Sequence, residues 1–155
     1  YNLMEVPEGM EITHIVGLIG EYQREGKIKL KQGMFNDGVI TFHDACKIQR
    51  RGGHIQEPRE ILNLLAPESF KEMTPSREES VCCGGGGGVI AIKEADPIRY
   101  AAFELKIDQM RKVGAKTVVM SCSNCRLQYT DCVQHFDLDV KVAGLSQMVA
   151  DALEE

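Results

Sequence analysis

The sequence has no long hydrophobic run and no block of basic residues. No segment approaches the roughly 20 apolar residues that a membrane-spanning helix requires, and the first residues lack the basic-then-apolar order of a signal peptide. The 18 basic and 23 acidic residues are scattered along the chain and give a net charge of −5, so no basic stripe could follow a phosphate backbone. We therefore expect a soluble chain that does not bind nucleic acid.

Nucleotide-binding motifs are also missing. The run of glycines at residues 84–88 is followed neither by Gly-x-Gly-x-x-Gly in its usual setting nor by Gly-Lys-Ser/Thr at the start of a helix. The chain begins with Tyr1 rather than methionine, which we interpret as the start of a piece of a longer protein.

The length and hydrophobic content are those of one ordinary domain. A chain of 155 residues that is 43% hydrophobic can fill a core without disulfide bonds. Its six cysteines therefore fit metal ligation in a reducing compartment better than three disulfides, and we interpret the compartment as cytoplasmic. We expect residues 1–38 to supply an N-terminal helix and a connection, and residues 39–155 to form the cysteine-rich part of the same domain.

Hydrophobic periodicity predicts helices that alternate with strands. Helices are predicted over residues 11–25, 57–66, 97–113, 123–136 and 145–153. Strands are predicted at residues 39–42, 117–120 and 140–142. In the longest helix we expect Asp96 as N-cap and apolar positions at Ala101, Leu105, Ile107, Met110 and Val113. The alternation predicts an α/β layered fold with a mainly parallel sheet flanked by helices.

Three groups of cysteines follow this framework at regular intervals. Each interval is about the length of one strand–helix unit, so we expect the groups on neighbouring loops. Sites in parallel sheets form outside the carboxyl ends of the strands, where such loops meet. The five thiols expected to converge there are Cys46, Cys82, Cys83, Cys122 and Cys125.

Converging thiolates are typical of metal sites. They are the soft ligands that hold iron–sulfur clusters or zinc, and a Cys-x-x-Cys pair at a helix start can direct both sulfurs to one centre. Zinc is normally satisfied by four ligands, so five thiolates favour a polynuclear cluster, with zinc as the alternative. The glycine run lets the adjacent cysteines face one site. Its first residues are cofactor-binding candidates through their backbone N–H groups: Gly84, Gly85 and Gly86.

Other polar residues near the first cysteine have two interpretations each. His43 could protonate a leaving thiolate near pH 7, which makes it a catalytic candidate, or it could be a core histidine bonded to the backbone. Lys47, Arg50 and Arg51 could attract an anionic substrate or simply be solvated. Cys132, further along the same predicted helix as the last cysteine pair, is interpreted as a buried thiol outside the site.

The motif Cys-(x)n-Cys-Cys-Gly-(x)n-Cys-x-x-Cys, together with the segments 41–46 and 57–59 and the glycine tail 85–88, resembles a known family. It is the cysteine-rich CCG domain of heterodisulfide reductase-like iron–sulfur proteins, and the resemblance spans residues 39–150. Within this family, the chain is most similar to the DsrK branch, a subunit of a membrane complex associated with sulfite reductase.

The resemblance implies a catalytic fragment of a larger iron–sulfur oxidoreductase subunit of sulfur metabolism. The five cysteines would hold a 4Fe–4S cluster of the non-cubane type. Electrons would pass between a membrane cytochrome subunit, upstream ferredoxin-type clusters and a disulfide or trisulfide substrate, in this branch one carried by a small thiol protein. The protein would lie at the inner face of the membrane through its partners. Alternatives are a zinc-holding docking module and the iron–sulfur subunit of a glycolate, lactate or glycerol-phosphate dehydrogenase.

Overall fold

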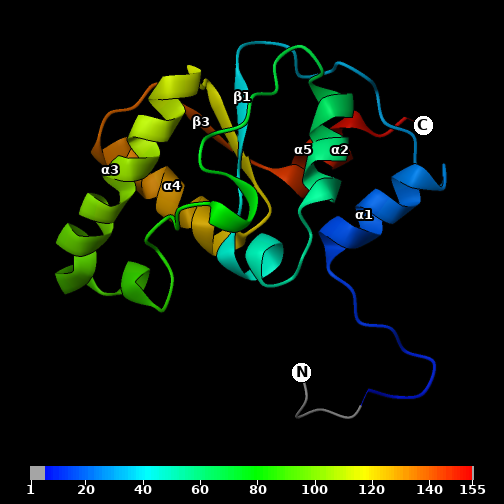
Figure 1. Cartoon of the computed structure of the whole chain (residues 1–155), viewed down its shortest axis with the longest axis horizontal. Coiled ribbons are helices and arrows are strands. Elements are labelled where there is room, and N and C mark those ends of the chain that lie inside the picture. Colours follow the sequence, from blue (N-terminus) through cyan, green and yellow to red (C-terminus); the bar gives the residue numbers. More distant parts are fainter. Residues whose placement is uncertain (1–5, 155) are drawn as a thin grey trace.

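The computed structural model describes residues 6–154, so the prediction drawn from Tyr1 lies outside the described residues. The strands are β1 (Ile40–His43), β2 (Thr117–Met120) and β3 (Lys141–Gly144). The helices are α1 (Ile15–Arg24), α2 (Gln56–Leu65), α3 (Asp96–Val113), α4 (Ser123–His135) and α5 (Leu145–Ala152) (Figure 1). Short helical turns are η1 (Cys46–Arg50), η2 (Arg77–Glu79), η3 (Val89–Ala91) and η4 (Lys93–Ala95).

The three strands form one parallel sheet in the order β1-β2-β3, which confirms the predicted α/β class. The register sets His43, Met120 and Gly144 side by side at the carboxyl end of the sheet. Parallel strands end at the same edge, so the segments that follow β1 and β2 leave the sheet together. That edge is where the sequence predicts the site.

The predicted helices are all present, with shifted ends. The first begins at Ile15, later than predicted, because His14 is its N-cap and accepts a hydrogen bond from the Val16 N–H at 3.2 Å. Asp96 is the first residue of α3 rather than its N-cap. Its carboxylate accepts a hydrogen bond from Arg99 Nε at 2.7 Å, so it is held within the first turn instead of capping it.

Two hydrophobic cores lie on the two faces of the sheet. Successive side chains of a strand point to opposite faces. Ile40 and Phe42 therefore pack in one core with α1, α2 and α5, whereas Val118 and Met120 of β2 pack in the other with α3 and α4. Figure 1 shows the same division, with α2 and α5 on one side of the strands and α3 and α4 on the other. The alternation turns the side chain of His43 toward α3 and α4.

The buried face of α3 differs from the predicted one. Leu105, expected to pack, is 57% exposed, whereas its neighbour Lys106 is fully buried with Phe103. Phe103, Ile107 and Met110 stand at the i, i+4 and i+7 positions that define one helix face, and Leu105 points away from it. The predicted set mixed residues from both sides of the helix.

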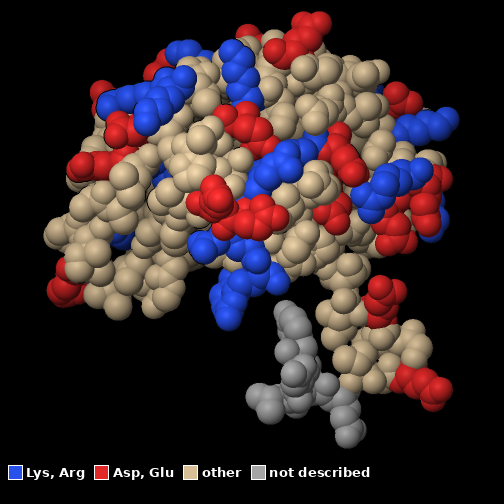
Figure 2. All heavy atoms as spheres, viewed as in Figure 1, with Lys and Arg blue, Asp and Glu red and all other residues tan. Residues whose placement is uncertain are grey.

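Charged side chains of both signs are mixed on the molecular surface. Figure 2 shows lysine and arginine interspersed with aspartate and glutamate over the face in view.

Within residues 6–154, no helix combines the length and the apolar character that a membrane span requires.

Candidate metal centre

The three cysteine groups follow the carboxyl ends of β1 and β2 and the loop between them. Cys46 begins η1 directly after β1. Cys122 is the N-cap of α4, and Cys125 lies in the first turn of that helix. The intervening loop delivers Cys83, whose sulfur lies 3.5 Å from that of Cys125. Loops that are far apart in the sequence thus bring their thiols together.

Four of the predicted cysteines have thiols close enough to change one another's pKa. Burial raises the pKa of Cys46, and the neighbouring Cys82 thiol raises it further. The neighbouring Cys83 thiol and then burial raise the pKa of Cys82 to about 12. The hydrogen bond with Cys125, together with burial, raises the pKa of Cys83 to about 12. The thiols of Cys46, Cys82 and Cys83 are therefore protonated at neutral pH in the metal-free chain.

Cys122 lies at the margin of this group. It is half-buried and packs against the same core as Cys83 and Cys125. Among the described residues, no hydrogen bond joins its sulfur to the other thiols. All six cysteines of the chain are free, including Cys132, which is fully buried as its place on α4 predicted. A metal bound here would displace protons from thiols, so uptake would release protons.

A buried glutamine connects two of the cysteine loops. Gln49 Oε1 accepts a hydrogen bond from the Ala45 N–H at 2.7 Å, and Gln49 Nε2 donates to Ser121 Oγ at 3.0 Å. The residues it contacts immediately precede Cys46 and Cys122. Gln49 therefore fixes the spacing between these two loops, a role that no sequence motif indicated.

The first two glycines of the run are tightly placed against the site. The Gly84 N–H donates to the Cys82 sulfur at 3.4 Å, and Gly84 has a φ of +85°, which favours glycine. The Gly85 carbonyl accepts a hydrogen bond from Asn124 Nδ2 at 2.8 Å, and a Cβ on Gly85 would lie 2.7 Å from Gln128 Cβ. By contrast, Gly86 is exposed, with no heavy atom near the position of a Cβ.

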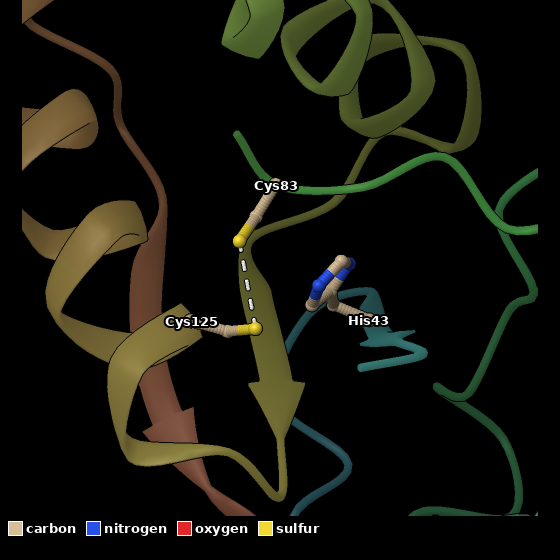
Figure 3. Close-up of side chains that lie close together, drawn as sticks. All are labelled: His43, Cys83 and Cys125. Atoms are coloured by element: carbon tan, nitrogen blue, oxygen red, sulfur yellow. Dashed lines mark hydrogen bonds between the residues drawn. The ribbon is translucent and has the colours of Figure 1, made fainter. Parts of the chain in front are cut away.

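His43 points toward the paired sulfurs. One nitrogen of its ring and the sulfurs of Cys83 and Cys125 lie within 4.8 Å of one another (Figure 3). The side chain is fully buried, and neither Nδ1 nor Nε2 has a hydrogen-bond partner among the described residues. The ring packs on Tyr129 at a centroid distance of 5.0 Å, and the Tyr129 hydroxyl is likewise buried without a partner.

The buried polar atoms of His43 and Tyr129 that have no hydrogen-bond partner indicate whether the site fits an iron–sulfur cluster. Buried polar groups in folded proteins are almost always hydrogen-bonded, so an unpaired imidazole and hydroxyl beside thiols need a partner. Cluster sulfides accept hydrogen bonds, and thiolates bind the iron. Thiols combined with the N–H of His43 and the O–H of Tyr129 are therefore a donor set that fits such a cluster.

His43 is not in the protonated form that a proton donor at pH 7 would need. Burial lowers the pKa of His43 well below its ordinary value, and the positive charge of Lys106 lowers it further. The ring is therefore neutral at pH 7 and offers one N–H and one lone pair. The alternative of a core histidine bonded to the backbone is not supported either, because the described residues supply no such partner.

Basic side chains lie next to the first cysteine. A hollow of about 480 Å³ is lined by Cys46, Lys47, Arg50, Arg51 and Glu78. The predicted basic residues are thus at the entrance to Cys46, on the exposed face of η1.

The structure adds a lysine that sequence reasoning did not single out. Burial lowers the pKa of Lys106 to about 8, an effect that the thiolate form of Cys83 and the carboxylate of Asp44 oppose. The lysine lies between Phe103 and Met110 on the buried face of α3. Its place on the apolar face of the predicted helix is the one feature of the sequence that could have indicated its burial.

Cysteine-bearing loops that converge at the carboxyl edge of a small parallel sheet are the arrangement that a metal-binding domain of the α/β class requires. A family model, the cysteine-rich domain CCG, matches residues 40–130, and the chain belongs to this family.

Relatives of this chain are components of multi-subunit redox enzymes. It is 29% identical over 143 residues to one subunit of the dihydromethanophenazine:CoB–CoM heterodisulfide reductase of Methanosarcina barkeri, covering 92% of this chain and 34% of the relative. It is 25% identical over 146 residues to the Hdr-like menaquinol oxidoreductase iron–sulfur subunit of Archaeoglobus profundus, covering 90% and 26%.

A third relative is one subunit of the fumarate reductase (CoM/CoB) of Methanothermobacter marburgensis, 34% identical over 112 residues, with 71% of this chain and 22% of the relative covered. The chain therefore spans about a third or less of the length of these relatives. The resemblance to heterodisulfide reductase-like proteins is confirmed, whereas assignment to the DsrK branch stays a prediction.

Proposed function

We propose that this chain is the cluster-binding domain of a heterodisulfide reductase-like oxidoreductase that exchanges electrons with a disulfide or trisulfide substrate. The observation that carries the proposal is the 3.5 Å approach of the Cys83 and Cys125 sulfurs beside the unpaired imidazole of His43. The redox function of the relatives supports it.

The cluster ligands in this proposal are the five predicted cysteines: Cys46, Cys82, Cys83, Cys122 and Cys125. A 4Fe–4S cluster has four irons, so a fifth thiolate favours a non-cubane arrangement. When bound, the cluster would supply single-electron exchange with the substrate. Gly84 stabilises it through the N–H that already faces the Cys82 sulfur.

The chain's own residues bind and orient the substrate. Reduction of one S–S bond consumes two electrons and two protons and yields two thiols. The neutral His43 ring donates one N–H to a sulfur beside Cys83 and Cys125, which stabilises charge that develops there. Arg50 and Arg51 attract an anionic substrate into the hollow beside Cys46.

The proposal places this domain within a larger assembly. Because the chain spans only part of its relatives, electrons would reach it through ferredoxin-type clusters elsewhere in the full subunit and through a membrane cytochrome partner. The protein would then be cytoplasmic, at the inner face of the membrane. Residues 39–155 would form the CCG unit and residues 1–38 would belong to the same domain, since Val16 of α1 is buried in the core that α2 and α5 share.

Anaerobic reconstitution with iron and sulfide tests the proposal. About four irons and four acid-labile sulfides per chain are expected. An EPR signal of the oxidised protein that changes on addition of a thiol would support substrate binding at the cluster. The same cluster with a signal insensitive to thiols would favour the dehydrogenase-type electron-transfer subunit. Retention of one zinc with no uptake of iron would refute the redox proposal in favour of a docking module.

A further inference from the structure

Lys106 is a buried cation with few hydrogen-bond partners. Its side chain is fully buried on α3, and its Nζ donates to Gln109 Oε1 at 2.8 Å. Gln109 Nε2 in turn donates to the Pro75 carbonyl at 3.2 Å, which fixes the amide with its oxygen toward the lysine. An ammonium has three N–H donors, and among the described residues this neutral oxygen is the one acceptor they have.

Asp44, the carboxylate whose charge acts on Lys106, is bound to another cation. Asp44 receives two hydrogen bonds from Arg59, Nη1 to Oδ1 at 2.6 Å and Nη2 to Oδ2 at 2.7 Å, and a third from the Arg77 N–H at 2.7 Å. Arg59 also donates from Nε to Glu72 at 2.7 Å. Asp44 is therefore held by Arg59, and among the described residues it forms no ion pair with Lys106.

The cysteine thiols lie close to this lysine, because its neighbours on α3, Phe103 and Ile107, pack in the same core as Cys83 and Cys125. The thiolate forms of Cys83, Cys82 and Cys46 all favour the charged form of Lys106. A lone buried cation is costly in a protein interior, whereas one placed beside metal-bound thiolates is stabilised by them. The position of Lys106 is thus unfavourable in the metal-free chain and favourable once negative charge enters the site.

We propose that Lys106 is a positioning residue that supplies a buried counter-charge to the metal-bound thiolates of Cys82 and Cys83 and thereby raises the reduction potential of the centre. The inference rests on the proposed function, since it assigns a role at the same site. A fixed positive charge stabilises the reduced, more negative state more than the oxidised state. The positive charge of Lys106 also helps the protein to retain a negatively charged metal centre in apolar surroundings.

Other basic residues near the site cannot replace it. Arg59 and Arg99 are also buried, but both are paired with carboxylates. Lys47, Arg50 and Arg51 are exposed, so water and salt screen their charges. Within the described residues, Lys106 is the buried cation that has no carboxylate in an ion pair.

Two substitutions separate the charge of Lys106 from its volume. Lys106→Met removes the charge and keeps a long flexible side chain, whereas Lys106→Arg keeps the charge. Lys116→Met is the matched control, because it makes the same change at an exposed lysine paired with Asp139. Each chain is reconstituted with iron and sulfide, its fold is checked by circular dichroism, and its midpoint potential is measured by an EPR-monitored redox titration.

Lys106→Met is expected to lower the reduction equilibrium constant at least tenfold, which is 59 mV for a one-electron couple. Lys106→Arg and Lys116→Met should keep the parent's potential. If Lys106→Met holds a cluster at the parent's potential, the inference is overturned while the proposed function stands. If Lys106→Met folds but loses the cluster, retention by Lys106→Arg supports the counter-charge, and loss from both overturns it.

If the parent chain itself takes up no iron, the proposed function fails separately. The counter-charge is then tested with Co²⁺, whose thiolate complexes are coloured. Co²⁺ binding at least tenfold weaker in Lys106→Met than in the parent and in Lys116→Met supports it, and equal binding overturns it.

Discussion

The sulfurs of Cys83 and Cys125 lie 3.5 Å apart, although 42 positions separate the two residues in the chain. One comes from the loop before the glycine run and the other from the first turn of α4. Their contact depends on the carboxyl edge of the sheet. Helix α4 starts at this edge, directly after β2, and the loop that carries Cys83 must pass close to the same edge. This pair is therefore the most direct target for testing the centre.

Replacing Cys83 or Cys125 by alanine should remove most of the iron that the reconstituted chain binds. Each substitution deletes a thiolate from the connected sulfur group, and thiolates are the ligands that iron–sulfur clusters require. Cys132→Ala is the matched control, since Cys132 is also buried and lies on α4 but belongs outside the proposed ligand set. Iron and sulfide counts measure the effect. Equal iron loss in all three variants would mean that buried thiols matter for folding rather than for ligation.

Adjacent glycines allow a second matched comparison. A Cβ on Gly85 would lie 2.7 Å from Gln128 Cβ, whereas one on Gly86 would meet no heavy atom within 4 Å. Gln128 cannot easily move, because it is fully buried and its Oε1 accepts a hydrogen bond from Arg99 Nη1 at 3.2 Å. Overpacking of this kind typically costs about 1–3 kcal/mol.

Gly85→Ala should therefore lower the free energy of unfolding by this amount and reduce iron uptake, and Gly86→Ala should change both little. Urea denaturation of the iron-free chains and iron counts of the loaded ones provide the measurements. Equal effects of the two substitutions would show that the loop, and not the contact with Gln128, decides the cost.

The sequence was sufficient for the framework of this site. Among the described residues, short β-branched runs and helical periodicity located the three strands and the five α-helices, because each buries an apolar face, but not the short helical turns η1 to η4. Cys46 and Cys122 were expected beyond the ends of parallel strands, and the structure places them there. These features follow from local patterns and from the topology of parallel sheets.

Side-chain direction inside the core was not predictable in the same way. Lys106 and Gln49 are polar residues at fully buried positions. The burial of Gln49 depends on a hydrogen-bond partner more than 70 positions away in the chain. The burial of Lys106 depends on the cysteine loops. A hydrophobic pattern assigns such residues to the surface. The wrong placement of Leu105 has the same origin, since composition alone does not say which helix face meets the sheet.

The buried pair of Asp44 and Arg59 should be important for stability. Asp44 is 1% exposed, and alanine at this position would leave Arg59 buried with one fewer anion and the Arg77 N–H without an acceptor. Removal of one partner of a buried ion pair typically costs about 3–5 kcal/mol. The control is Asp139→Ala, which breaks an exposed pair with Lys116 and should leave stability essentially unchanged. Urea denaturation compares the two variants, and a similarly small loss in both would contradict the stabilising role of the buried pair.

The burial of His43 predicts a specific loss of stability in acid. The pKa of His43 is well below 6.5 in the folded chain and near 6.5 in the unfolded chain. Between these two values the unfolded chain binds one more proton, so the free energy of unfolding increases with pH. This contribution is fully present above pH 6.5 and is lost as pH falls toward the folded pKa, by at most about 1.4 kcal/mol per pH unit.

Replacement of His43 by glutamine removes this titration without adding a charge. In the iron-free chain, the parent should therefore lose more stability than His43→Gln between pH 7 and pH 5 (~1.4 kcal/mol per pH unit at most), because all other titrating groups are common to both. Urea denaturation at the two pH values gives the difference. Parallel pH profiles would mean that His43 gains a proton in the folded state as easily as in the unfolded state, and the imidazolium could then serve as the acid that the sequence suggested.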